Sequence, residues 1–155
     1  MGLAPYGDPQ SDRVAKYTET IKKELVDISD DGSIWLNQEY FDYATGLKMV
    51  DEEKWKRLFG FPVRKPEAEL LAEHCDLALA IQRVTEETVL KMAAESKRLT
   101  GSKNICLAGG VALNCVANGK LLRDGMFDGM WIQPAAGDAG GALGAAYCAY
   151  HIYFD

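Results

Sequence analysis

The sequence predicts an α/β fold, and three observations lead to this prediction. Between residues 104 and 151, a short apolar run, a glycine-rich loop and a helical stretch follow one another twice. Residues 24–37 have the pattern of two strands around a turn, and residues 66–99 repeat apolar side chains at the helical period. We therefore expect a mixed sheet, in which an antiparallel meander precedes parallel strands, with helices on its faces.

The N-terminal part of the chain predicts a loop, a helix, a hairpin and a second short helix. Two glycines and two prolines within residues 1–9 are typical of a turn-rich loop. Asp30-Asp31-Gly32 suits a hairpin turn, because glycine tolerates the positive φ that such turns require. We expect a polar helix over residues 12–23, strands over 24–28 and 33–37, an extension of the meander at 40–43, and a helix over 51–59 that ends at Gly60.

Residues 66–99 predict one long amphipathic helix or two collinear ones. Pro66 suits the first helical position, and the basic pair Lys97 and Arg98 suits the last turn before Gly101. Side chains recurring every three or four residues form a stripe that we expect to pack on a sheet as core. The stripe consists of Leu77, Ile81, Val84, Thr88, Met92 and Ser96.

The final third of the chain predicts strands over residues 104–108 and 129–132 and helices over 112–123 and 138–151. This βαβα order requires a parallel sheet. The carboxyl ends of parallel strands lie at one edge, where open α/β sheets bind ligands. We therefore expect two glycine-rich segments, residues 107–114 and 137–146, to be neighbours in space.

Composition limits the classes of function. The 155 residues, 17.0 kDa, suit one compact domain, and 23 acidic against 17 basic side chains give a net charge of −6. Without a basic stripe, binding to nucleic acid or to an anionic membrane is not expected. No apolar run is long enough to span a bilayer and no signal-peptide block is present, so we expect a cytoplasmic protein.

The spacing of the cysteines and histidines indicates neither a metal site nor a catalytic pair. We expect the four cysteines, which lie among aliphatic residues without a C-x-x-C pair, to be small buried side chains. His74 and His151 are expected to be surface or half-buried residues, and no nucleophile–base arrangement is visible. The cysteines are Cys75, Cys106, Cys115 and Cys148.

The first glycine loop has two interpretations. The backbone N–H groups of Gly109 and Gly110 at a helix N-terminus can hold a phosphate or the sugar of a nucleotide. Alternatively, the pair forms a tight strand-to-helix turn that needs small residues for packing. The side chain of Asn114 can bond a ribose hydroxyl or face solvent.

The second glycine loop, like the first, is compatible with ligand binding or with a structural role. Residues 137–146 are almost all small, which permits close approach by a flat ligand or by another helix. Asp138 is the acid of this segment, and it can cap the last helix or bind a divalent cation beside a phosphate. Composition alone favours the cap.

Four ordered motifs resemble the nodulation-type O-carbamoyltransferases, and the resemblance runs from residue 1 to about residue 150. The motifs are MGLAPYG at residues 1–7, YFD at 40–42, AGGVALN at 108–114 and QPAAGDAGGALGAA at 133–146. Together and in this order they are far more specific than any one of them.

The resemblance implies a ribonuclease-H-like lobe, similar to the actin-like ATPases and to tRNA threonylcarbamoyl-transfer enzymes. It also implies an enzyme of biosynthesis that forms carbamoyl-adenylate from carbamoyl phosphate and ATP and carbamoylates a hydroxyl of a small-molecule acceptor. A divalent metal, iron in the family, is held there by two histidines and an aspartate. By position, the aspartate is Asp138, and the nucleotide-binding residues are Gly109, Gly110, Val111, Asn114, Gly137, Gly140 and Gly141.

The chain also departs from the family pattern. No H-x-x-x-H motif is present, so we expect residues 1–155 to be a single lobe, without the first lobe and the C-terminal carbamoyl-phosphate domain. Such a lobe is expected to be inactive alone and to expose an apolar patch that favours homo-oligomers. The alternatives are a sugar kinase, a tRNA threonylcarbamoyl transferase and a non-catalytic nucleotide-binding domain, and no catalytic residue is assigned.

Overall fold

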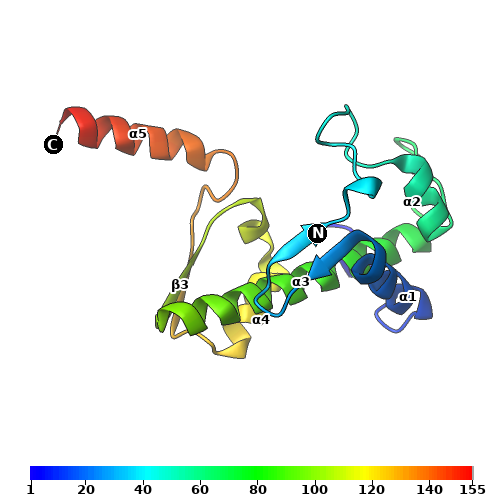
Figure 1. The fold of residues 1–155 in the computed structure, drawn as a ribbon, viewed down its shortest axis with the longest axis horizontal. Coiled ribbons are helices and arrows are strands. Elements are labelled where there is room, and N and C mark those ends of the chain that lie inside the picture. Colours follow the sequence, from blue (N-terminus) through cyan, green and yellow to red (C-terminus); the bar gives the residue numbers. More distant parts are fainter. Residues whose placement is uncertain (155) are drawn as a thin grey trace. The chain divides into compact units, whose positions relative to one another are not determined.

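The computed structural model describes residues 1–154, and the chain divides into two compact units, Met1–Lys91 and Met92–Asp155. Helix α3, Ala72–Thr100, contributes residues to both (Figure 1). The first unit contains the predicted hairpin, and the second contains the predicted βαβα order. The chain is therefore α/β, as expected.

The first unit follows the predicted order of elements. The hairpin is antiparallel, and Gly32 at its turn has φ +80°. The expected extension at residues 40–43 is limited to an isolated bridge between Phe41 and Val50. The helices are α1, Asp12–Thr20, continued by a π-helical turn over Ile21–Leu25, and α2, Glu52–Phe59; the strands are β1, Val26–Ile28, and β2, Ile34–Leu36; 3₁₀ helices cover Ala4–Tyr6 and Gln38–Tyr40.

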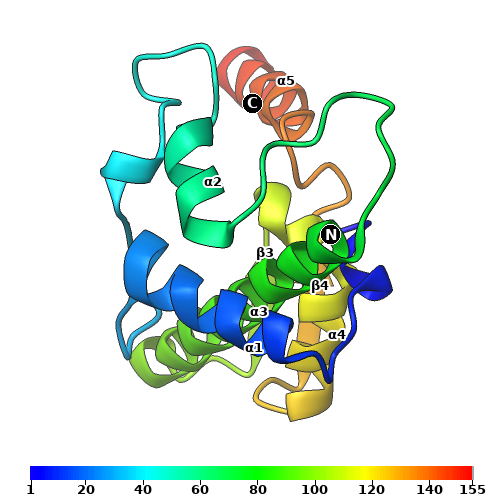
Figure 2. The ribbon, with the colours of Figure 1, turned by 90° about the vertical axis from the view of Figure 1, so that its right-hand side faces the viewer.

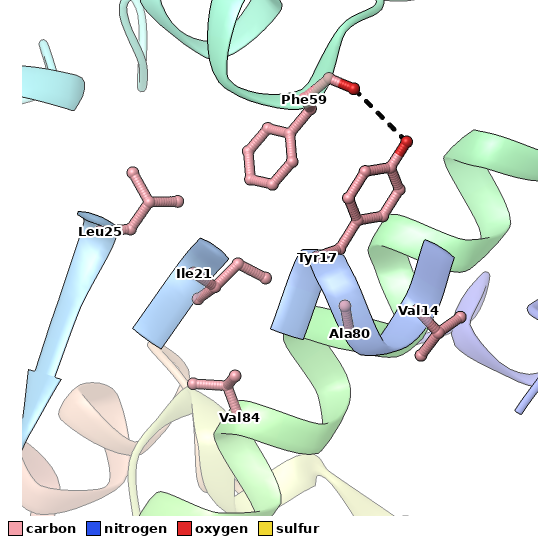
Figure 3. Close-up of a cluster of buried hydrophobic side chains, with 7 residues drawn as sticks. All are labelled: Val14, Tyr17, Ile21, Leu25, Phe59, Ala80 and Val84. Atoms are coloured by element: carbon pink, nitrogen blue, oxygen red, sulfur yellow. Dashed lines mark hydrogen bonds between the residues drawn. The ribbon is translucent and has the colours of Figure 1, made fainter. Parts of the chain in front are cut away.

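A small apolar core lies between α1, α2 and α3 (Figure 3). The ring of Tyr17 meets the ring of Phe59 edge to face at 5.4 Å, and its hydroxyl donates to the Phe59 carbonyl at 3.4 Å. Burial raises the pKa of the Tyr17 phenol above its ordinary value. Figure 2 shows α1 running beside α3, which supplies Ala80 and Val84 to this core.

Helix α3 begins at Ala72, so the prediction of a start at Pro66 was wrong. Glu67 has φ +60°, a left-handed conformation that no α-helix contains. The helix is instead preceded by a cap, in which the Leu71 N–H donates to Nδ1 of His74 at 2.9 Å. Because a histidine side chain seldom caps a helix, the sequence pattern favoured a helix start at Pro66.

The predicted stripe on α3 is only partly buried. Val84 is buried, whereas Ile81, Met92 and Ser96 are exposed. Ala80 is completely buried, and its small side chain lets α1 approach closely. The stripe that α3 buries is therefore only partly the predicted one, and it packs against α1 and against a cluster that also touches Val26 and Ile28 of β1.

The second unit contains a parallel pair of strands, which confirms that part of the predicted topology. Strands β3 and β4 pair from Asn104 with Gly129 to Leu107 with Ile132. The expected single mixed sheet is wrong, because β1 and β2 pair only with each other, as do β3 and β4, within the described residues. The elements are β3, Asn104–Leu107, a 3₁₀ helix over Gly110–Leu113, α4, Cys115–Asp124, β4, Gly129–Ile132, and α5, Gly140–Tyr153.

Helix α5 exposes its apolar side chains. None of its residues is buried, although Leu143, Tyr147 and Tyr150 are among them. An exposed apolar surface was expected, and α5 provides one. The expectation that all four cysteines are buried is wrong, since the free thiols of Cys106, Cys115 and Cys148 are exposed. No helix of the described residues is long and apolar enough to cross a membrane.

Candidate functional site

The two glycine loops meet at one edge of the β3–β4 pair, as the topology predicted. Both follow the carboxyl ends of the strands, which lie side by side (Figure 2). The Gly109 N–H donates to the Ala136 carbonyl at 2.7 Å, and the Gln133 N–H donates to the Leu107 carbonyl at 3.0 Å. These two bonds join the segments into one continuous rim.

In the first loop, only one glycine of the pair is explained by backbone geometry. Gly109 has φ +93°, which favours glycine strongly. Gly110 does not have positive φ, and a Cβ placed on it would meet no atom within 4 Å. Packing within the described residues therefore does not require glycine at position 110. Val111 beside it is 55% exposed.

Asn114 has a structural role at the end of the first glycine loop. It is only 2% exposed, and its Oδ1 accepts the Ala117 N–H at 3.2 Å, which caps α4. The interpretation of Asn114 as facing solvent is therefore wrong. Helix α4 begins at Cys115 because a 3₁₀ helix precedes it, whereas a start near residue 112 was expected.

A second asparagine, which the sequence pattern did not single out, also supports the first loop. Asn118 is buried, and its Nδ2 donates to the Ala112 carbonyl at 2.7 Å, which fixes the 3₁₀ helix onto α4. Its spacing of four residues from Asn114 places both amides on one face of α4. This repeated amide at i and i+4 is the signal that identifies the pair.

The second loop contains one glycine that the fold requires. A Cβ on Gly140 would lie 2.5 Å from the Ala135 carbonyl oxygen, which is too close. A Cβ on Gly141 would meet nothing within 4 Å, and one on Gly137 would lie 3.9 Å from Cδ1 of Leu113, an ordinary contact. Gly137 and Gly141, like Gly110, are thus glycines that internal packing does not require.

Asp138 is exposed on the rim and does not cap α5. The helix begins at Gly140, its N-cap residue is Ala139, and no side chain caps it. The N-cap interpretation of Asp138 is therefore wrong, since the helix starts two residues later than expected. Its backbone carbonyl accepts the Gly141 N–H at 3.2 Å, and the residue is exposed.

The residues do not form a metal centre by themselves. Within residues 1–154, no group of three or more histidine, cysteine, aspartate or glutamate side chains is arranged to hold an ion. His74 uses its Nδ1 in the cap of α3, and His151 stacks on Tyr147 with ring centroids 6.3 Å apart. A single exposed carboxylate binds a divalent ion weakly, so Asp138 requires further ligands to do so.

The first unit contains a separate polar cavity of about 630 Å³, which was not predicted from the sequence. Phe41 and Asp42 of the YFD motif line it, and Lys48 forms an ion pair with Glu52 at 2.9 Å on its wall. The signal for this cavity is the acidic run at residues 51–53, which follows the motif closely in the chain. The cavity has an excess of carboxylates, from Glu39, Asp42, Asp51, Glu52 and Glu53.

Comparison with known proteins identifies relatives over nearly the whole chain. Residues 1–147 match the family model of the carbamoyltransferase N-terminus. The uncharacterized protein sll1178 of Synechocystis sp. is 53% identical over 153 residues, which are 99% of this chain and 24% of that protein.

Two nodulation proteins are also similar. Nodulation protein NolO of Bradyrhizobium diazoefficiens is 36% identical over 146 residues, 94% of this chain and 23% of that protein. Nodulation protein NolNO of Sinorhizobium fredii is 37% identical over 148 residues, 94% of this chain and 19% of that protein. The chain thus spans about a quarter or less of the length of these relatives.

Proposed function

The chain belongs to the carbamoyltransferase family, and from this membership we propose that the whole protein transfers a carbamoyl group to a hydroxyl of a small molecule. Water releases the phosphate of carbamoyl phosphate, and an oxygen of the resulting carbamate bonds to the α-phosphorus of ATP as pyrophosphate leaves, which gives carbamoyl-adenylate as the donor. The acceptor oxygen bonds to the carbamoyl carbon, the bond from that carbon to the phosphate oxygen breaks, and AMP leaves with the electron pair while a base takes the hydroxyl proton.

The rim formed by the two glycine loops supports this proposal most strongly. Gly110 and Gly141 lack side chains although the fold leaves room for them. Bare backbone at such positions lets a ligand approach the two loops closely. A nucleotide phosphate is suited to this rim, because anions are stabilised by N–H groups at the start of a helix, and α5 begins at Gly140.

The residues of the rim act by binding and orientation. Gly109 and Gly140 maintain the shape of the two loops, and Asn114 and Asn118 hold the first loop from below. Holding the adenylate in a fixed position brings its carbamoyl carbon within reach of an acceptor, which lowers the entropic barrier of the transfer.

Asp138 is proposed as one ligand of a divalent metal ion, which is iron in the family that the motifs resemble. The ion would need further ligands from elsewhere in the whole protein, because residues 1–154 contain no group of ligands around Asp138. We therefore expect the chain of 155 residues alone to bind such an ion weakly and to transfer no carbamoyl group.

The test is a turnover assay of the whole protein with ATP, carbamoyl phosphate and a polyol acceptor. We expect AMP and pyrophosphate as products, and we expect Gly110→Val to raise the KM for ATP at least about tenfold, because its side chain covers the N–H groups. Gly119→Ala on α4 is the control, since its added Cβ meets only the flexible end of Arg123.

Two results would contradict the proposal. Release of ADP in place of AMP and pyrophosphate would indicate a kinase. Unchanged nucleotide affinity in both Gly110→Val and Asp138→Ala would indicate that the glycine loops do not bind the nucleotide.

A further inference from the structure

His74 closes the first turn of α3 with a hydrogen bond that depends on its state of protonation. Its Nδ1 accepts the Leu71 N–H at 2.9 Å. Because this nitrogen accepts, it carries no hydrogen, and the neutral ring holds its proton on Nε2. The helix begins at Ala72, so His74 is its third residue. A side chain that reaches back from this position to the N–H before the helix is half of a capping box.

A second proton on the His74 ring removes this hydrogen bond. An imidazolium has two N–H donors and no acceptor, so the Leu71 N–H loses its partner. The new positive charge lies in the first turn of α3, where the helix dipole disfavours cations. Imidazole takes up this proton between about pH 8 and pH 5. The cap is therefore present at alkaline pH and is lost as the pH falls.

The charges on α1 and α3 beside His74 already pair with one another. Nη1 of Arg13 lies 3.8 Å from the carboxylate of Glu73 and 3.2 Å from that of Asp76. The two acids that flank His74 on its own helix thus share a basic partner from α1. They do not replace the acceptor that the Leu71 N–H loses.

The connection from α2 to α3 contacts the imidazole through an aromatic ring. Phe61 meets it edge to face at 5.3 Å, and the ring of Tyr17 packs on Phe61 at 6.2 Å. The Tyr17 phenol stays neutral in this pH range, because burial raises its pKa. The charged side chains of this connection are exposed, so solvent screens their effect on the imidazole. They are Arg64, Lys65, Glu67 and Glu69.

The first turn of α3 also holds the opening motif, which is MGLAPYG at residues 1–7. Gly7 lies so close to the helix that a Cβ on it would be 2.7 Å from the Cys75 carbonyl oxygen. The next residue, Asp8, donates its N–H to Oδ1 of Asp76 at 3.0 Å. The backbone at the end of the motif is thus fixed to two consecutive residues of α3.

We propose that His74 is a pH-sensitive switch, which keeps the opening motif docked when it is neutral and releases it when it is protonated. Cys75 and Asp76 directly follow His74 in the chain, so unwinding of this turn displaces both anchors of the motif. The switch lies within the first unit, and it does not depend on the proposed nucleotide site.

Amide hydrogen exchange of the whole protein at about pH 8 and about pH 5.5 tests the switch, with labelling times scaled to the intrinsic exchange rate. In the wild type, we expect protection in residues 3–8 and 71–76 to fall about tenfold at the lower pH, as loss of a helix cap implies. Residues 80–88, in later turns of α3, should keep their protection. An equal loss there would indicate general acid unfolding and would overturn the switch.

Two variants at position 74 separate protonation from a purely structural role. His74→Gln supplies an acceptor that does not titrate, and glutamine is a usual partner in a capping box, so protection should stay high at both pH values. His74→Phe keeps a ring beside Phe61 but has no acceptor, so protection should be about tenfold lower at both pH values. His151→Gln on α5 is the control and should retain the pH dependence of the wild type.

Two further outcomes would contradict the switch. If His74→Gln loses protection at the lower pH as the wild type does, other groups cause the pH dependence. If residues 71–76 lose protection while residues 3–8 keep it, docking of the opening motif does not depend on His74.

Discussion

Asp76 is a buried carboxylate on α3 that holds the opening motif in place. Its Oδ1 accepts the Asp8 N–H at 3.0 Å, and its Oδ2 lies 3.2 Å from Nη1 of Arg13. Next to it, Gly7 sits so close to α3 that a Cβ would lie 2.7 Å from the Cys75 carbonyl oxygen. A buried carboxylate is stabilising only when its hydrogen bonds are made, so this cluster fixes the loop in one position.

We expect Asp76→Ala to destabilise the protein by about 1–3 kcal/mol, because the Asp8 N–H and Arg13 lose a charged partner. Equilibrium denaturation measures the change. Glu73→Ala is the control, since Glu73 is more exposed and lies 3.8 Å from Arg13, and it should cost less than half as much. Equal losses in the two variants would contradict the role of Asp76.

The buried phenol of Tyr17 should lower the free energy of unfolding at high pH. Burial raises the pKa of its phenol above 10.0 in the folded chain, nearby Arg13 lowers it, and Glu73 and Asp76 raise it. The unfolded chain therefore releases this proton at lower pH than the folded chain does. The contribution of the neutral phenol is complete below the unfolded pKa and is lost as pH rises through the folded pKa.

In Tyr17→Phe, the decline of the unfolding free energy above pH 10 should be shallower than in the wild type. Chemical denaturation at several alkaline pH values measures the slope. Tyr6→Phe removes an exposed hydroxyl and serves as the comparison. An unchanged slope in Tyr17→Phe would show that burial of this phenol does not govern alkaline stability.

At the scale of elements, two adjacent glycines at the start of α5 differ in the space around them. Gly140→Ala forces a methyl against the Ala135 carbonyl oxygen and should destabilise the chain by about 1–3 kcal/mol. Gly141→Ala meets open space and should be neutral or stabilising by up to about 1 kcal/mol, because alanine favours helix. Thermal unfolding without nucleotide compares the two, and equal effects would contradict this account of the turn.

The ends of helices were predicted well where a single capping residue determines where the helix begins or ends. Helix α2 begins after Asp51, whose carboxylate accepts the Lys54 N–H, and ends at Gly60 with φ +85°. Thr100 ends α3 before Gly101, which also has positive φ. Such caps depend on neighbours within a few residues and are therefore visible in the sequence.

Features that depend on distant residues were not predictable. The start of α3 depends on His74, whose ring also meets Phe61 edge to face at 5.3 Å. The buried stripe of α3 depends on where α1 packs. In the site, the meeting of the two loops followed from parallel topology. The helix caps did not, because α4 and α5 begin later than expected, so that Asn114 caps α4 and Asp138 does not cap α5.

At the scale of the whole molecule, the exposed helix α5 has consequences for association. A helix that is apolar on all sides is normally enclosed by other parts of a protein. We expect the chain of 155 residues alone to self-associate at high concentration, and we expect Leu143→Ser with Tyr147→Ser to reduce this association. Sedimentation velocity over a concentration series measures it, and a strictly monomeric wild type would contradict the prediction.

We propose that the two glycine loops act together as one nucleotide-binding rim at the edge of β3 and β4. The most direct measurement is amide hydrogen exchange of the whole protein with and without ATP. We predict that ATP slows exchange in residues 109–113 and 137–141 together, because both loops contact the same ligand. Slowing in only one of the two segments, or in neither while ATP is bound, would contradict the account.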